Sequence, residues 1–132
     1  MGNKKLVEWV LRVAVFGEFV GHGVFALQGK PQWVGWIQQF GVITDPESAK
    51  NFLYLIGWVD IVGAFVMLIY PFPFILLAAA FWGFFTALVR PLVGEPIWDF
   101  VERWANWGAP LALLLLLGWP KKLGGWFKKI GK

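Results

Sequence analysis

The sequence predicts an all-α integral membrane protein: a bundle of four transmembrane helices, with a short amphipathic helix in the first and in the third loop. Of its 132 residues, 58% are hydrophobic and only 15% are charged. Charged residues are too few to cover the surface of a soluble domain of this size, whereas a lipid bilayer suits long unbroken apolar stretches. The chain has no cysteine, which excludes disulfides and thiolate chemistry within it.

Four apolar stretches are long enough, or nearly long enough, to cross a hydrocarbon core of about 30 Å at about 1.5 Å per residue. We predict transmembrane helices at residues 6–28, 49–70, 74–89 and 106–119. Prolines are expected to end the first three helices, at Pro31, Pro71 and Pro91. Thr44 is the expected N-cap of the second helix. The turn between the second and third helices is very short, so we expect them to be antiparallel neighbours.

Two of the loops, residues 31–43 and 95–104, carry tryptophans on one side of a helical repeat, including Trp33, Trp36 and Trp98. We predict that each loop contains a short amphipathic helix lying in the membrane interface. Each of these segments follows one long helix and precedes another. The two halves of the chain are therefore predicted to be weak repeats of one helix–amphipathic helix–helix unit.

Basic residues gather near the two ends of the chain, at Lys4, Lys5, Arg12, Lys121, Lys122, Lys128, Lys129 and Lys132. An even number of crossings puts both ends on one side, and the positive-inside rule makes that side cytoplasmic. We therefore predict a multi-pass protein of the cytoplasmic (plasma, or cell inner) membrane with both termini in the cytoplasm. Residues 120–132 are the predicted basic tail, lying on anionic lipid. The bilayer, not nucleic acid, is thus the partner that the net charge of +4 indicates.

Ionisable side chains inside the membrane are the candidates for a functional site, because each costs roughly 2.5–3.5 kcal/mol at the bilayer centre. Glu18 and His22 are four residues apart and share one helix face. Asp60 is predicted at a similar depth, and Thr86 and Arg90 share a face of the third helix at about the same level. Trp82 is expected near Thr86, and Glu95 is expected to close the cluster from above. The candidate residues are therefore Glu18, His22, Asp60, Trp82, Thr86, Arg90 and Glu95.

The residues leave several roles open for this cluster. Its members could be ion pairs that fix helix packing, or the polar end of a pocket for a quinone or similar molecule, with Trp82 or Trp58 against its ring. They could also relay protons in coupled transport, or hold zinc, manganese or iron through Glu18, His22 and Asp60. Haem is disfavoured, because the chain has a single histidine.

Three short patterns carry a resemblance to a known family. The first helix holds Arg12, Gly17, Phe19 and Gly21-His22-Gly23, with Lys30 just beyond; the other patterns are residues 57–63 and 106–113. In these patterns the chain resembles the DoxX-like family of small four-helix integral membrane proteins. The resemblance implies a membrane protein linked to redox metabolism, in some members as a subunit of a thiosulfate:quinone oxidoreductase.

These observations together give the expected function. We expect a binding or accessory subunit that holds a quinone-like or lipid-like small molecule, with a redox partner subunit or a second copy of the chain as its protein partner. No motif of a soluble catalytic domain is present, so an enzyme acting alone is the least favoured interpretation. A proton-coupled transporter and a purely structural subunit of a membrane complex are the alternatives.

Overall fold

The computed structural model describes residues 2–41 and 43–130. Val42, in the predicted segment 31–43, and Lys132, in the predicted basic tail, lie outside the described residues. The regular structure of the described part is entirely helical, as the sequence predicts. Its elements are α1 (Asn3–Leu27), α2 (Pro31–Gln39), α3 (Pro46–Ile69), α4 (Pro73–Leu92), α5 (Ile97–Val101), α6 (Ala105–Leu117) and the short 3-10 helix η1 (Leu123–Phe127).

Three of the described helices, α1, α3 and α4, are long and apolar enough to cross a membrane. The predicted fourth span, residues 106–119, is shorter in the structure: α6 has 13 residues, or about 20 Å of helix. Large apolar side chains lie exposed on the outer faces of the long helices and of α6, among them Val10, Val13, Val59, Val62, Phe81 and Leu115. Exposed apolar side chains in this number are what acyl chains cover and what water would disfavour.

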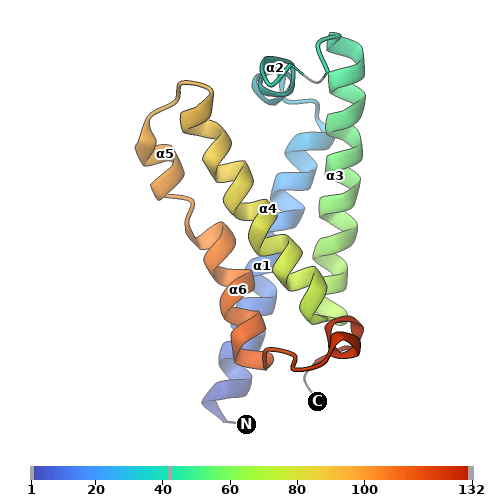
Figure 1. Ribbon diagram of the computed structural model, residues 1–132, viewed down its shortest axis with the longest axis vertical. Coiled ribbons are helices and arrows are strands. Elements are labelled where there is room, and N and C mark those ends of the chain that lie inside the picture. The colour runs from blue at the N-terminus through green and yellow to red at the C-terminus, as the bar shows by residue number, and fades with distance from the viewer. Residues whose placement is uncertain (1, 42, 131–132) are drawn as a thin grey trace.

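Helices pair within each half of the chain (Figure 1): α1 packs along α3, and α4 packs along α6, while α1 also contacts α6. Both termini and η1 lie at one end of the bundle. The opposite end, formed by α2, α5 and the segments that join them to the long helices, is called the loop end below. The expectation that α3 and α4 are close neighbours holds only beside their hairpin, because the two helices diverge toward the loop end.

Glycines allow the closest helix crossings in both halves. A Cβ atom on Gly23 of α1 would lie 2.6 Å from Ile61 Cγ1 and 2.8 Å from the carbonyl oxygen of Gly57 on α3. A Cβ atom on Gly83 of α4 would overlap the backbone carbonyl of Asn106 on α6. Backbones therefore touch at both crossings, as small residues permit in membrane helices.

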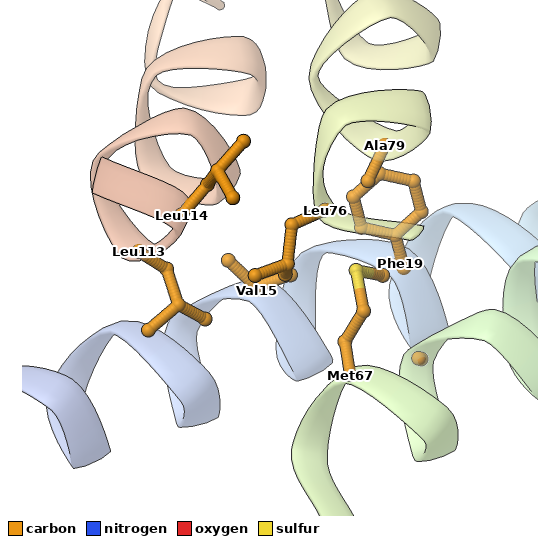
Figure 2. Close-up of a cluster of buried hydrophobic side chains, with 8 residues drawn as sticks. Val15, Phe19, Met67, Leu76, Ala79, Leu113 and Leu114 are labelled. Atoms are coloured by element: carbon orange, nitrogen blue, oxygen red, sulfur yellow. The ribbon is translucent and has the colours of Figure 1, made fainter. Parts of the chain in front are cut away.

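The buried core lies where α1, α3, α4 and α6 meet (Figure 2). Its side chains are Val15, Phe19, Ala64, Met67, Leu76, Ala79, Leu113 and Leu114. The cluster combines the short Ala64 and Ala79 with longer side chains such as Phe19, which lets the four helices interdigitate at this level. The bundle is thus closed toward the termini, and the space that remains open is nearer the loop end.

Arg12 joins α1 to the end of α3 near the termini. Its guanidinium is buried, lies 3.0 Å from Glu8 Oε1, and donates to the carbonyl oxygens of Leu68 and Ile69. The last turn of α3 leaves carbonyl oxygens without helical partners, because the helix ends at Ile69 and Pro71 follows its C-cap. In the sequence, Arg12 helps to predict the cytoplasmic side and is part of a family pattern. In the structure Arg12 is buried, and its side chain caps the C-terminal end of α3.

The start of α3 and the end of α4 both differ from the prediction. Asp45, not Thr44, is the N-cap of α3, and its Oδ2 accepts from the backbone N–H of Ser48 at 2.9 Å. This bond lowers the pKa of Asp45, so the cap acts at neutral pH and is lost as the pH falls through the lowered pKa. Helix α4 continues past Pro91 to Leu92, because a proline in the last turn removes only one helical hydrogen bond.

Candidate functional site

A cavity of about 390 Å³ lies at the loop end, beneath α2 and between α3 and α4, with one side chain from α1. This volume is within the range of small-molecule sites, which start at about 300 Å³. Aromatic rings make up much of the wall: Trp33, Trp36, Phe40, Phe52, Trp82 and Phe85. The polar lining residues are His22, Thr86 and Arg90. The cavity is therefore an apolar chamber with a few polar groups in its wall.

His22 is held in the wall by two contacts. Its Nδ1 lies 2.9 Å from Oδ2 of Asp60, which is only 4% exposed, and its ring stacks on Trp33 at 4.6 Å between centroids. When Asp60 is ionised, its carboxylate can only accept, and Nδ1 is then the donor in this pair. The other ring nitrogen, Nε2, has no protein partner in the described part of the chain. Asp60 thus holds the imidazole of His22 in place, but Asp60 does not itself line the cavity.

Arg90 is the second polar group, and it stands apart from the first. Its side chain is buried at 8% exposure, donates from Nη1 to the carbonyl oxygen of Thr86 at 2.8 Å, and lies 5.2 Å from the ring centre of Trp36. Within residues 2–41 and 43–130, no carboxylate forms an ion pair with it. Glu95, which the sequence predicts would close the cluster from above, instead accepts from Gln32 Nε2 at 3.3 Å.

The predicted seven-residue cluster is therefore only partly assembled. The cavity brings His22, Trp82, Thr86 and Arg90 together, while Glu18, Asp60 and Glu95 lie outside its wall. Glu18 is half-buried on α1 and close enough to Asp60 for their charges to interact.

The three residues named for a metal site do not form one in the structure. No group of three or more histidine, cysteine, aspartate or glutamate side chains among the described residues is arranged to hold a metal ion. Asp60 is engaged with the imidazole of His22, and Glu18 contributes no third ligand beside them. The alternative of a metal ion held by Glu18, His22 and Asp60 therefore has no support in this arrangement.

Two tryptophans of the wall carry indole donors without a partner. The Nε1 atoms of Trp33 and Trp82 are buried and have no hydrogen-bond partner among the described residues, and Nε1 of Trp107, outside the wall, is a third such donor. Because these nitrogens have almost no accessible surface, a molecule in the cavity does not reach them in this arrangement. The hydroxyl of Thr86 is also engaged, because it donates to the carbonyl oxygen of Trp82 at 2.9 Å. The polar groups that the wall offers to a ligand are therefore those of His22 and Arg90.

The face of α2 is the part of the site that the sequence did not predict. The spacing of Trp33, Trp36 and Phe40 indicated an interfacial helix facing lipid, but these side chains line the cavity, and Trp33 is only 6% exposed. Conversely, Trp58, predicted as a partner for a ligand ring, is 59% exposed on the outside of α3. An apolar face of a short helix has the same period whether it covers lipid or a cavity, so periodicity does not distinguish them.

The fold and the cavity define the class of the protein: an all-helical chain with three helices long and apolar enough to cross a membrane and a small-molecule-sized cavity under a short helix. No protein-family model matches the chain, and neither a curated protein nor a solved structure matches it. The resemblance to the DoxX-like family therefore stays a prediction.

The His22–Asp60 pair gives a direct spectroscopic prediction, because the chain has one histidine. In protein labelled with ¹⁵N-histidine, the ring should show a protonated Nδ1 at neutral pH, since Asp60 accepts its proton. Asp60→Asn should shift the ring ¹⁵N resonances toward the mixed tautomers of free imidazole, whereas the matched change Glu18→Gln should shift them less. Unchanged resonances in Asp60→Asn would contradict the pair.

Proposed function

We propose that this chain is an integral protein of the cytoplasmic membrane that binds a quinone-like or lipid-like small molecule in the cavity at the loop end. The observation that carries the proposal is the cavity itself, with its aromatic wall and its few polar groups, those of His22, Thr86 and Arg90. A largely apolar chamber with a small number of polar groups is the usual form of a small-molecule site.

A four-crossing topology with both termini in the cytoplasm belongs to the same proposal. Its support is that both ends of the chain lie at one end of the bundle, beside the predicted cytoplasmic lysines (Figure 1). Helix α6 is shorter than a usual span, and a short span is tolerated through local thinning of the bilayer. Exposed Trp104 and Trp119 flank α6 and suit the two membrane interfaces.

The lining residues fit the head of a quinone. A quinone is a flat ring with carbonyl acceptors, and the wall offers aromatic faces for the ring and the remaining N–H donors of Arg90 for a carbonyl. Arg90, His22 and Trp82 are the residues that would hold it, and a bound quinone would supply electron transfer. This fit supports the role that the DoxX-like resemblance implies, an accessory subunit of membrane redox metabolism, although the resemblance itself rests on short patterns.

Filling the cavity tests the proposal. Ile56 lines the cavity, whereas its neighbour Leu55 is exposed on the outside of α3. Ile56→Trp should weaken the binding of decylubiquinone or decanoate to the protein in nanodiscs by about tenfold or more, that is, by at least about 1.4 kcal/mol. Leu55→Trp should bind like the wild type. Equal binding by both variants, or no saturable binding of either probe to the wild type, would overturn the proposal.

Proton-coupled transport is a second candidate, favoured by one observation. Glu18 and Asp60 interact electrostatically next to the cavity, and Asp60 bonds the imidazole in its wall, so three titratable groups lie in succession. If the chain uses them to carry protons, proteoliposomes should show a proton flux that Asp60→Asn abolishes and Glu47→Gln, at the exposed start of α3, does not. Wild-type flux no greater than that of empty liposomes would remove this candidate.

A further inference from the structure

The charges around the cavity are unbalanced. Among the described residues that line the wall, Arg90 is the one with a permanent charge. Of its five N–H donors, only one is used in a hydrogen bond within the described ranges, to the carbonyl of Thr86. Its face is covered by the ring of Trp36, so the guanidinium is largely shielded from solvent. The wall therefore contains a buried cation, and most of its N–H donors make no hydrogen bond to the described residues.

The neighbouring carboxylates are engaged elsewhere. Asp60 is bonded to His22, Glu95 to Gln32, and Glu102 to Arg103 at 2.6 Å. Asp99, Glu95 and Glu102 act on Arg90 only at longer range, and the positive charge of Arg103 opposes them. Among the described residues, no side chain is placed to neutralise Arg90 directly.

A buried guanidinium without a counter-ion is unfavourable, and an oxyanion is the group that satisfies it best. A carboxylate accepts two parallel N–H bonds from arginine, and charge-assisted bonds of this kind are about twice as strong as neutral ones. With a single cation in the wall, the balanced partner is an anion of one charge. The remainder of the wall is apolar and aromatic, which suits an alkyl chain and not a second charge.

We infer that the cavity selects an amphiphile with one carboxylate head and one apolar chain, such as an ionised fatty acid. This inference rests on the proposed function and decides between its two ligand classes, since it favours an acidic lipid over a neutral quinone. The head binds Arg90 near the loop end of α4, and the chain lies along α4 toward Trp82. Arg90 and Trp82 are eight residues apart on α4, or about 12 Å of helix, which gives the chain a wall to follow.

The test compares three probes of equal chain length: decanoate, decanol and methyl decanoate. Labelled decanoate is bound to the full chain in nanodiscs of phosphatidylcholine, at a pH where the acid is ionised, with the signal of empty nanodiscs subtracted. Competition by the three unlabelled probes should give an affinity for decanoate higher than that for the alcohol or the ester by about tenfold or more. Equal affinities would overturn this inference and leave the binding function standing. No saturable binding of any probe would overturn both.

Charge variants locate the selectivity. Arg90→Gln should lose the preference for decanoate while keeping its affinity for decanol, which also reports that the variant is folded. Arg90→Lys should retain part of the preference, because it keeps the charge and loses the paired geometry. Arg103→Gln, at the same end of the bundle but outside the cavity wall, is the matched control and should bind like the wild type. If Arg103→Gln loses the preference as fully as Arg90→Gln, a general surface charge explains it and the inference is wrong.

Discussion

Replacing Arg12 with methionine should lower the free energy of unfolding by about 3–5 kcal/mol, the typical effect of breaking a buried ion pair from one side. The change leaves Glu8 buried with only Lys5 as a counter-ion, and removes the donor from the carbonyls at the end of α3. Reversible unfolding in mixed micelles with increasing dodecyl sulfate, followed by circular dichroism, measures the difference.

Two companion variants identify the cause. Lys4→Met removes an exposed charge from the same end of α1 and should change stability little. The double variant Glu8→Gln with Arg12→Met should be more stable than Arg12→Met alone, because it removes the uncompensated carboxylate. A single Arg12→Met variant as stable as the wild type would mean that the buried pair and the cap on α3 do not exist in solution.

Adding one methyl group at Gly83 should also destabilise the bundle, by about 1–3 kcal/mol. The new Cβ would overlap the backbone of Asn106, so α4 and α6 would have to separate, and backbone cannot move aside as a flexible side chain does. The comparison is with Gly63→Ala on α3, where no atom lies within 4 Å of the added Cβ.

The two alanine variants should have different effects on the free energy of unfolding. Gly63→Ala should be neutral or should stabilise by up to about 1 kcal/mol, because alanine is the better helix former. Unfolding of both proteins under the same conditions provides the measurement. Equal stabilities of the two variants would show that α4 and α6 do not cross closely at Gly83. The pairing of α4 with α6 described above would then be wrong.

The helices were largely predictable from the sequence because hydrophobic length and proline are local signals. Their ends were less so: Thr44 and Asp45 both carry a capping oxygen, and only the backbone geometry decides which is used. The pairing of α1 with α3 and of α4 with α6 depends on which glycines meet across the bundle, and that is a property of the whole fold.

The site was harder to predict, for a physical reason. Ionisable residues in apolar helices pointed to His22 and Arg90, both of which line the cavity. They did not indicate that Glu95 would bond Gln32, which is 63 positions away in the sequence. The aromatic side chains of α2 were assigned to the membrane interface. Trp33 and Trp36 have the same helical spacing whether they face the interface or line a cavity. The role of Arg12 at the end of α3 likewise depends on carbonyl groups 56 and 57 residues away.

The central claim is that the cavity under α2 is occupied by an amphiphile from the bilayer. A decanoate that carries a photoreactive diazirine on its chain tests this most directly, with the labelled residues mapped by mass spectrometry. Labelling that excess unlabelled decanoate abolishes should fall on cavity residues, such as Phe52, Ile56, Trp82 and Phe85. Labelling that falls on Val10, Val59 and Val62, which are exposed on the outside of the bundle, and that is not reduced by competitor, would contradict the claim.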